Sequence, residues 1–217
     1  NQYEKTKYIF DHSYKLKVAK WFQDKLHIIP CKFIDNQFFV RKEIKLFRLF
    51  NSFIKRISDL FFSCFLILVT SPIIFIASFL IFIEDGGPIF YTQVRSGLNG
   101  KKFKIIKLRT MKCDAENGMA IWSSEKDKRI TKIGNFLRKS RIDEIPQLWN
   151  VIRNDMSLIG PRPERPELEV DLIKELPLFK LRYSKLPGLT GWAQVNYPYA
   201  SSLKETENKL CFDLFYI

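Results

Sequence analysis

An uncharged apolar stretch from Leu60 to Ile83 restricts the fold of this chain more than any other feature. It contains 24 residues without a charged side chain. A straight α-helix of that length would extend about 36 Å, whereas the hydrocarbon core of a bilayer is about 30 Å thick. A single spanning helix is therefore feasible by length.

The dipeptide Ser71-Pro72 at the middle of this stretch favours a different path. Proline removes a backbone donor and kinks a helix, and each half of about 11 residues would cover only about 17 Å. Cationic side chains, which favour the cytoplasmic side of a membrane, flank both ends. They are Arg41, Lys42, Lys45, Arg48, Lys55 and Arg56 before the stretch, and Arg95, Lys101, Lys102 and Lys104 after it. We expect a re-entrant hairpin that returns to the face it entered, with a spanning helix as the alternative.

The chain carries a formal net charge of +13 over 217 residues. Such a surplus favours an anionic partner, namely nucleic acid, acidic lipid or a phosphate-bearing substrate, or it simply keeps the protein soluble. The neighbouring apolar stretch shifts the expectation towards lipid and phosphate. Residues 41–57 alternate cations with apolar residues at helical spacing, which predicts an amphipathic helix that lies on a membrane surface or packs against the protein.

Histidine and cysteine are too few and too scattered to suggest a metal or redox centre. The chain has two histidines and four widely separated cysteines, so neither a zinc knuckle nor a His-ligated metal is expected. Reduced thiols fit a cytosolic environment. Any catalysis must therefore use carboxylates, cations and a hard metal ion such as Mg²⁺.

The adjacent carboxylates Asp143 and Glu144 lie in a strongly basic run that includes Arg138 and Arg141. Pro146 places the pair at the start of a helix, which also favours bound phosphate oxygens. One interpretation is structural, with Asp143 capping the helix and Glu144 complementing its dipole. The other is chemical, because a carboxylate among cations can bind Mg²⁺ or attack an anionic phosphate whose charge the cations neutralise.

Two further motifs could bind phosphate. The runs 88–94 and 102–109 predict a β-hairpin, and the intervening segment Arg95 to Gly100 either cradles phosphate through its backbone amides or needs glycine only for the turn. Lys107 and Arg109 would project from one face of the second strand. Arg162 lies between two prolines in Gly160-Pro-Arg-Pro163, where it has little freedom to lose on binding a phosphate, although a tight loop is the alternative.

The predicted fold class is α/β, of the α+β type, with a small helix-rich catalytic domain that contains the β-hairpin and follows the re-entrant membrane hairpin. Helices are predicted over residues 129–140, 143–153, 164–176 and 203–210, a turn entering a strand over 186–195, and a strand-like run over 212–217. We divide the chain into residues 1–40, which end an upstream domain in this interpretation, residues 41–83, which enter the membrane, and residues 84–217, a catalytic domain expected to be C-terminally incomplete.

In these motifs the chain resembles the bacterial sugar transferases, the monotopic polyprenyl-phosphate phosphoglycosyl transferases. The resemblance covers roughly residues 54–217, in the expected order and spacing. It rests on the segments Lys55-Arg-Ile-Ser-Asp59, Ser71-Pro72, Arg95-Ser-Gly-Leu-Asn-Gly100, Lys107-Leu-Arg-Thr-Met111, Ile142-Asp-Glu-Ile-Pro-Gln-Leu148, Asn150-Val-Ile-Arg-Asn-Asp-Met-Ser-Leu-Ile-Gly-Pro-Arg-Pro163 and Pro187-Gly-Leu-Thr-Gly-Trp-Ala-Gln-Val-Asn196.

The resemblance implies a ping-pong reaction that requires Mg²⁺. An aspartate attacks the β-phosphate of a UDP-sugar and releases UMP, and the phosphosugar then passes to polyprenyl phosphate, which is undecaprenyl phosphate in bacteria. The product would initiate exopolysaccharide, capsule or O-antigen synthesis. It also implies the bacterial inner membrane as the location, with the catalytic domain on the cytoplasmic face. The implied partners are a UDP-sugar, polyprenyl phosphate and membrane lipid, not nucleic acid, and a homo-oligomer is compatible with the sequence.

The resemblance also implies roles for individual residues. Asp143 would be the nucleophile and Glu144 its acidic partner, both able to hold Mg²⁺, and Arg138 the active-site arginine ahead of them. Substrate would be bound by Lys107, Arg109, Arg162, Asp213 and Arg95. Ser71 and Pro72 would mark the break in the membrane helix.

The chain departs from the family pattern after Val195, where Asn196-Tyr-Pro-Tyr-Ala replaces the commoner Asn-Gly-Arg. With the run Arg162-Pro-Glu-Arg-Pro-Glu167, this variant resembles members tied to exopolysaccharide assembly and leaves the sugar open. Two other functions compete. A non-enzymatic protein could bind acidic membrane or nucleic acid, which gives the carboxylate pair no role. A glycosyltransferase that moves the sugar without its phosphate would release UDP instead of UMP.

Overall fold

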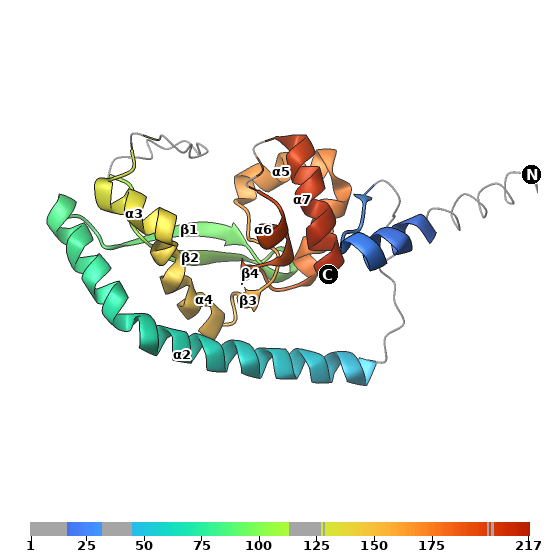
Figure 1. The fold of residues 1–217 in the computed structure, drawn as a ribbon, viewed down its shortest axis with the longest axis horizontal. Helices are drawn as coiled ribbons and strands as arrows, with labels where there is room; N and C mark the ends of the chain where they lie inside the picture. The colour runs from blue at the N-terminus through green and yellow to red at the C-terminus, as the bar shows by residue number, and fades with distance from the viewer. Residues whose placement is uncertain (1–16, 32–44, 113–126, 128, 199, 201) are drawn as a thin grey trace, which may run out of the picture.

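The computed structural model describes residues 17–31, 45–112, 127, 129–198, 200 and 202–217. Most of the predicted N-terminal segment, residues 1–40, lies outside the described residues, and the domain boundaries stay a prediction. The described part combines one long helix, short helices and two small sheets, which confirms the mixed α/β class. Figure 1 shows the long helix, α2, along one side of the globular part that holds the β-hairpin and the shorter helices.

Helix α2 (Lys45–Asp85) is continuous over 41 residues and contains Pro72. Because Pro72 has no N–H, the carbonyl of Leu68, four residues earlier, loses its helical partner. The hydroxyl of Ser71 donates to that carbonyl at 2.8 Å and so replaces the missing hydrogen bond. Figure 1 shows α2 bent along its length, as expected for a helix interrupted by proline. The predicted break at Ser71-Pro72 is thus a bend within one helix rather than a loop between two.

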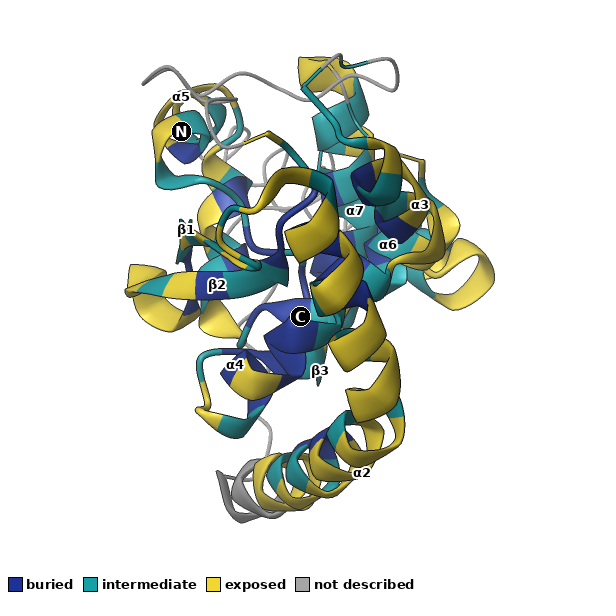
Figure 2. Cartoon of the chain, turned by 90° about the vertical axis from the view of Figure 1, so that its left-hand side faces the viewer, coloured by how far each residue is buried: buried dark blue, intermediate teal, exposed yellow. Residues whose placement is uncertain are grey.

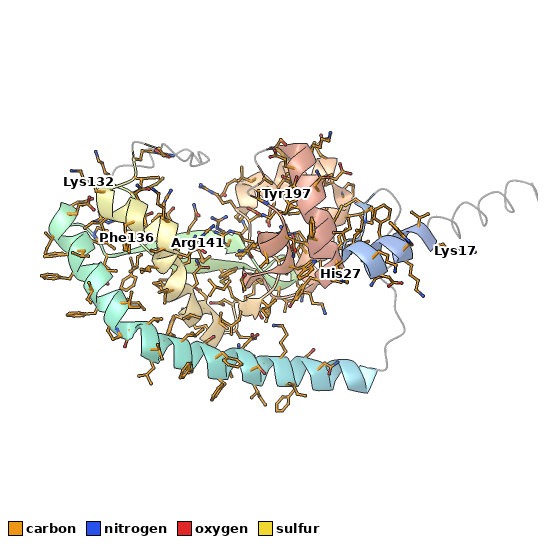
Figure 3. All side chains as sticks on the ribbon, in the orientation of Figure 1. Lys17, His27, Lys132, Phe136, Arg141 and Tyr197 are labelled. Atoms are coloured by element: carbon orange, nitrogen blue, oxygen red, sulfur yellow. The ribbon has the colours of Figure 1, made fainter. Side chains whose placement is uncertain are left out.

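The outer side of α2 is lined with exposed apolar side chains. Phe61, Leu68 and Phe75 are 65%, 73% and 75% exposed, and Figure 2 shows most of the helix surface in the exposed class. Side chains along this side point away from the rest of the chain in Figure 3. A contiguous surface of this kind is unfavourable in water and marks contact with a membrane or a protein. Within the described residues, one helical stretch, Asn51–Asp85, is long and apolar enough to cross a membrane, which suggests membrane association.

The apolar stretch of α2 is attached to the same globular part at both of its ends. Near its start, Arg56 donates to two backbone carbonyls in α4 (Leu148–Ile152), at 2.7 and 2.8 Å. At its end, Asp85 pairs with Arg109 at 2.9 Å. A membrane helix whose two ends contact one compact unit keeps both ends on the side of that unit. These contacts therefore support the same-side path predicted for the apolar stretch.

Single cysteines placed at the two ends of the apolar stretch are expected to react from the same side of a membrane. Ser52→Cys and Pro88→Cys, each in a chain whose native cysteines are changed to serine, would be exposed to an impermeant maleimide in sealed vesicles. A chain that keeps Cys64 alone is the control, because Cys64 is exposed within the apolar helix and should react only after detergent is added. Labelling of the two end positions from opposite sides would contradict the bent, same-side helix.

The predicted hairpin is confirmed. Strand β1 (Phe90–Ser96) pairs antiparallel with β2 (Lys102–Leu108), so that Phe90 lies opposite Leu108. The side chain of Asn150 joins this hairpin to α4, since its Oδ1 accepts from the amide of Ile106 at 3.1 Å. Lys107 therefore lies on a strand that is held by pairing with β1 on one side and by the hydrogen bond to α4 on the other.

Two backbone amides of the turn between the strands form hydrogen bonds within the turn itself. Asn99 and Gly100 adopt φ of 54° and 74°, the left-handed region that asparagine and glycine tolerate best. The amide of Gly97 donates to the Lys101 carbonyl at 2.8 Å, and the amide of Gly100 donates to the Gly97 carbonyl at 3.0 Å. These amides are used inside the turn, which favours the turn interpretation of the Arg95–Gly100 segment over the phosphate cradle.

Three consecutive helices pack over the hairpin: α3 (Lys132–Ser140), the 3₁₀ helix η4 (Ile142–Gln147) and α4. Their apolar residues join α2 and β2 in two buried clusters. The first cluster contains Ala77, Ile81, Leu108 and Leu137, and the second contains Ile105, Val151 and Met156. The core therefore lies between the membrane helix, the hairpin and the segment that carries Asp143 and Glu144.

The C-terminal part is mostly helical. Strand β3 (Ser157–Ile159) pairs in parallel with β4 (Gly188–Thr190). The helices of this part are α5 (Pro166–Glu175), the 3₁₀ helix η5 (Pro177–Ser184), α6 (Trp192–Asn196) and α7 (Leu203–Tyr216).

Two predictions in the C-terminal part were wrong. The strand-like run 212–217 continues α7 to Tyr216, because Leu210 and Leu214, four residues apart, bury one face of a helix at 1% and 0% exposure. The run 186–195, predicted as a turn entering a strand, forms only the short strand β4 before it continues as the helix α6. Aromatic and β-branched residues favour strands only where a sheet receives them, so tertiary packing overrode their propensity.

An N-terminal segment, residues 17–31, docks against the C-terminal helices. Residues 17–26 are helical, and Figure 3 shows His27 beside the C-terminal helices. The His27 carbonyl accepts from the indole N–H of Trp192 at 2.9 Å, and the Ile29 amide donates to the Cys211 carbonyl at 2.9 Å. The Ile29 side chain, 3% exposed, completes a core cluster. Its other buried members are Phe179, Leu210 and Leu214.

This docking brings together two thiols that are far apart in the sequence. The sulfur atoms of Cys31 and Cys211 lie 3.7 Å apart, and both cysteines are free. Their hydrogen bond lowers the pKa of Cys211 to about 7 and, together with burial, raises the pKa of Cys31. Sequence spacing could not have predicted this pair, because the tertiary fold alone creates it.

Candidate active site

Asp143 and Glu144 lie in η4, directly after α3. Arg141, in the left-handed region at φ 60°, ends α3 and begins η4. Both carboxylates are buried, at 7% and 8% exposure. No side chain caps the start of η4, so the capping interpretation of Asp143 does not hold. Two carboxylates without a capping role are thus held inside the protein.

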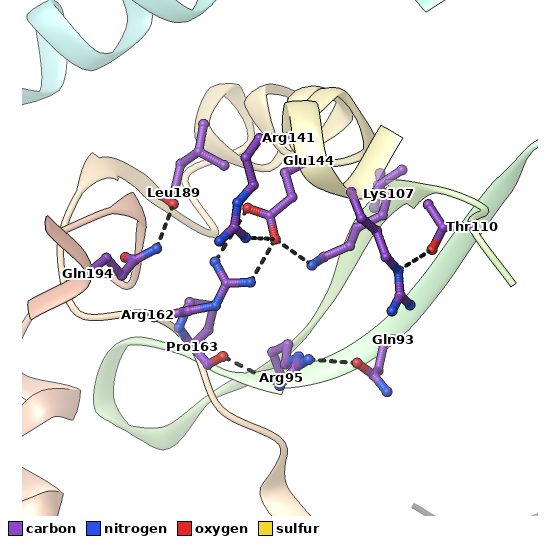
Figure 4. Close-up of polar contacts among 12 residues, drawn as sticks. Gln93, Arg95, Lys107, Thr110, Arg141, Glu144, Arg162, Pro163, Leu189 and Gln194 are labelled. Atoms are coloured by element: carbon purple, nitrogen blue, oxygen red, sulfur yellow. Dashed lines mark hydrogen bonds and ion pairs between the residues drawn. The ribbon is translucent and has the colours of Figure 1, made fainter. Parts of the chain in front are cut away.

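Glu144 is held by cations from three other positions. It accepts a hydrogen bond from Lys107 Nζ at 2.8 Å and from both terminal nitrogens of Arg162 at 2.6 and 3.3 Å. Arg141 approaches the same carboxylate at 3.9 Å. Figure 4 shows the Lys107 and Arg162 side chains pointing at Glu144 from opposite directions. Burial alone would raise the pKa of Glu144, but the charges and hydrogen bonds of Arg162 and Lys107 outweigh it and hold the pKa well below its usual range.

Asp143 is in a different state from its neighbour. Burial raises its pKa, and the nearby charge of Lys107 only partly opposes this shift. Its Oδ1 atom is buried and has no hydrogen-bond partner among the residues that the structure describes. An unsatisfied buried carboxylate oxygen is costly, which suggests that this atom is kept for an external group. The two adjacent carboxylates therefore differ. Glu144 is bound by cations, whereas Asp143 keeps an oxygen that is available to an external group.

Arg138 lies on α3 within the electrostatic reach of Asp143. Burial lowers the pKa of Arg138, and the charge of Asp143 opposes that shift. The Arg138 Nε donates to the Thr110 hydroxyl at 2.8 Å, and α3 can approach Thr110 because Gly134 has no side chain. A Cβ at Gly134 would lie 2.1 Å from the Thr110 carbonyl oxygen. The predicted arginine is therefore fixed beside the predicted nucleophile.

Arg162 reaches Glu144 from the turn that follows β3. Gly160, ahead of this turn, packs directly on Gly188 of β4, and a Cβ on Gly188 would lie 2.1 Å from the Gly160 amide nitrogen. Pro163 restricts the backbone of Arg162. The glycine contact and the proline together restrict the backbone from which the Arg162 side chain extends to Glu144.

Two of the other predicted substrate-binding arginines occupy different places. Arg95 lies beside the proline turn, where it donates to the Pro163 carbonyl at 3.5 Å and to Gln93 at 2.7 Å. Arg109 does not join Glu144 with Lys107, because it pairs with Asp85 at the end of α2. The strand β2 ends at Leu108, so the expected alternation does not extend to Arg109. Arg109 attaches the end of α2 to the hairpin.

The structure does not support direct substrate binding by Asp213. Its side chain is 4% exposed and bonded to Arg182 at 2.9 Å. Burial raises the pKa of Asp213, against the opposing charges of Arg182 and Lys209. A buried, paired carboxylate on the inner face of α7 is not available to a soluble nucleotide sugar. The family motif singled out Asp213 but did not predict its buried contact with Arg182.

Several residues that the sequence left without a role hold the site together. Arg182 joins Asp213 to the proline turn, Asn150 joins α4 to β2, and Asp59 on α2 accepts from the Ser157 hydroxyl at 2.7 Å. Polar residues in apolar surroundings, as in Trp149-Asn150-Val151, are the one signal that could have identified them. Their partners are distant in sequence and could not be inferred.

A hard cation fits this site only in a limited way. The described residues contain no group of three or more histidine, cysteine or acidic side chains that could hold a metal by itself. Both oxygens of Glu144 are engaged with cations, whereas Asp143 offers a free oxygen. Mg²⁺ commonly uses one or two carboxylates and completes its shell with water and substrate phosphates. The donor set therefore fits Mg²⁺ through Asp143 rather than through the predicted pair.

The sequence comparisons identify the family of this chain. The family model for bacterial sugar transferase matches residues 50–217. A protein of Bacillus subtilis (strain 168), named provisionally as an undecaprenyl-phosphate N-acetylgalactosaminyl 1-phosphate transferase, is 49% identical over 129 residues, covering 59% of this chain and 72% of the relative.

Two longer relatives match over more of this chain. The Aeromonas hydrophila UDP-N-acetylgalactosamine-undecaprenyl-phosphate N-acetylgalactosaminephosphotransferase is 39% identical over 166 residues, 76% of this chain and 39% of the relative. The Escherichia coli (strain K12) UDP-glucose:undecaprenyl-phosphate glucose-1-phosphate transferase is 34% identical over 169 residues, 77% of this chain and 36% of the relative. The chain thus spans well under half the length of these two relatives. With a match over most of its residues, the chain belongs to the bacterial sugar transferase family.

Proposed function

We propose that this protein transfers a sugar 1-phosphate from a UDP-sugar to undecaprenyl phosphate at a membrane surface. Support comes from the family match and from the names of relatives that act on undecaprenyl phosphate. The observation that carries the proposal is the contrast within the carboxylate pair, where Glu144 is neutralised by Lys107 and Arg162 while Asp143 retains a buried oxygen with no partner in the described residues.

In the first step, the free oxygen of Asp143 attacks the β-phosphorus of the UDP-sugar. The bond from that phosphorus to the oxygen bridging the two phosphates breaks, and UMP leaves with the electron pair. Cations aimed at the developing charge lower the barrier to such a step. Arg138, whose charge interacts with that of Asp143 and whose side chain is fixed on Thr110, would supply one of them. The enzyme then carries the phosphosugar as a mixed anhydride on Asp143.

In the second step, an oxygen of undecaprenyl phosphate attacks the same phosphorus and displaces the Asp143 carboxylate. The product is undecaprenyl-diphosphate-sugar, and the free enzyme is restored. The apolar stretch of α2 would bring the site to the membrane surface for this step, because contacts at both ends of the stretch attach it to the part that holds the site. The lipid phosphate and the soluble donor can therefore reach one carboxylate in turn.

Magnesium is the cofactor in this proposal. The Asp143 oxygen that does not attack would hold it, together with phosphate oxygens of the donor. When bound, Mg²⁺ would neutralise diphosphate charge as a Lewis acid. Lys107 and Arg162 occupy both oxygens of Glu144, which leaves Asp143 as the carboxylate that would hold the ion. We further propose that the site faces the cytoplasm and that the product initiates exopolysaccharide, capsule or O-antigen synthesis.

The nucleotide product tests the proposal. The purified protein in detergent or nanodiscs, with Mg²⁺, undecaprenyl phosphate and a panel of UDP-sugars, is expected to release UMP in proportion to the lipid-linked sugar formed. Release of UDP would instead indicate transfer of the sugar alone. A folded protein that releases neither nucleotide with any donor, but binds anionic vesicles or RNA, would support the non-enzymatic alternative.

A further inference from the structure

The C-terminal helix is joined to the active site by a buried ion pair. Asp213 on α7 accepts from Arg182 Nε on η5 at 2.9 Å, and the two side chains are 4% and 5% exposed. The Arg182 guanidinium also lies over the Phe179 ring, 4.4 Å from its centroid. Arg182 is therefore held from two sides, by a carboxylate and by an aromatic face.

The second nitrogen of Arg182 points towards the active site. Arg182 Nη2 donates to the backbone carbonyl of Arg162 at 2.6 Å, and the Arg162 side chain donates to Glu144. Three successive direct contacts thus lead from Asp213 to Glu144. Pro163 restricts the backbone of Arg162. The hydrogen bond from Arg182 to the Arg162 carbonyl therefore also helps to fix the direction of the Arg162 side chain.

Stability alone is a weak reason for such a pair. Burying two charges costs desolvation energy that can exceed their mutual attraction, and apolar residues of similar volume are often as stable. A buried pair whose arginine spends a second donor on an active-site turn fixes that turn in one geometry, which apolar packing could not do. A positioning role also differs from the substrate-binding role expected of Asp213, because neither side chain of the pair is accessible to substrate.

We propose that Arg182 and Asp213 are positioning residues that hold Arg162, and through it Glu144, in the geometry required for phosphosugar transfer. The inference rests on the proposed function. It assigns the acidic residue of the C-terminal helix to the orientation of the site rather than to contact with the substrate.

An apolar replacement of the pair separates positioning from stability. The double variant Arg182→Met with Asp213→Leu should fold with a thermal midpoint within a few degrees of the native protein, yet lose about tenfold or more in kcat/KM for the UDP-sugar, mostly in kcat. The control is Leu210→Ala on the same helix, whose side chain is buried but outside the polar path. It should lower the thermal midpoint while leaving kcat/KM per folded molecule within about twofold. A folded double variant with native kcat/KM would overturn the proposal.

A double-mutant cycle covers the case in which the apolar variant does not fold. Asp213→Asn is expected to reduce kcat/KM about tenfold in the native background but less than about threefold in Arg162→Lys, because it acts through Arg162. Equal losses in the two backgrounds would show a general effect and refute the positioning role.

The same cycle can be followed in thermal unfolding, which needs no substrate. Coupling through Arg182 should make the two shifts in thermal midpoint non-additive by about 2–4 °C, and additive shifts would count against the path. If the native protein releases no UMP, the proposed reaction fails, while this unfolding cycle still decides whether Asp213 is coupled to Arg162. The two failures are therefore distinguishable.

Discussion

Asp143→Asn is expected to reduce turnover by at least about a thousandfold, the scale seen when a catalytic nucleophile is removed. An amide oxygen is a far poorer nucleophile than a carboxylate, and it cannot leave as an anion in the second step. The change keeps the shape of the side chain and removes an ionisable group that burial already disfavours, so the thermal midpoint should not fall. Initial rates of UMP release, with unfolding as the control, measure both outcomes.

The same prediction has a direct chemical readout. Native protein quenched after exposure to a UDP-sugar without lipid acceptor should carry one phosphosugar on the peptide that contains Asp143, as measured by mass spectrometry. Asp143→Asn should carry none. Near-native turnover in this variant, or an adduct on another peptide, would remove Asp143 from the nucleophile role.

The second large effect is expected for Glu144→Gln. The change leaves Lys107 and Arg162 without the carboxylate that both bind, and losing hydrogen bonds to charged groups of this kind costs about 1.5–3 kcal/mol. We expect kcat/KM to fall by about a hundredfold or more, because Arg162 loses its fixed direction. Glu167→Gln is the matched control, since Glu167 is 60% exposed and pairs with Arg165 at 3.6 Å. Exposed pairs contribute at most about 1 kcal/mol.

The stability loss in Glu144→Gln should depend on pH in a defined direction. The folded pKa of Glu144 lies below its unfolded value of about 4.3, so ionised Glu144 stabilises the native protein above that pH, and this contribution is lost as the pH falls through the folded pKa. Denaturation in EDTA should therefore show the full difference between native and variant at neutral pH and a smaller one in acid. A stability difference between the native protein and Glu144→Gln that stays constant across this pH range would show that charge is not the cause. An unfolding midpoint of Glu144→Gln equal to that of Glu167→Gln would contradict the buried network.

Local patterns in the sequence were enough to predict the elements around the site. The uncharged run with Ser71-Pro72 predicted a bent membrane helix, the alternating residues of 102–109 predicted the second strand of the hairpin, and Asp143-Glu144 stood out among cations. Each of these depends on neighbours within a few positions, where spacing and propensity carry the information.

The predictions failed where distant segments decide the outcome. The run 212–217 becomes helix because Leu214 fits a core made partly by Ile29, which is 185 positions away in the sequence. The family resemblance assigned Asp213 to substrate binding, and nothing near it in the chain indicates that it pairs with Arg182. The different states of the two carboxylates likewise depend on Arg162 and Lys107, whose approach to Glu144 only the tertiary fold determines.

The docked segment 17–31 also bears on where this enzyme can be cut. The match to the family begins at residue 50, but Ile29 fills space next to Leu210 and Leu214 in the helix that carries Asp213. Removing a buried isoleucine side chain costs about 2–5 kcal/mol, a large share of the stability of an ordinary domain. A fragment that begins at residue 50 would therefore lose the segment that covers α7. We expect its C-terminal helix to be less stable and more readily cleaved by proteases.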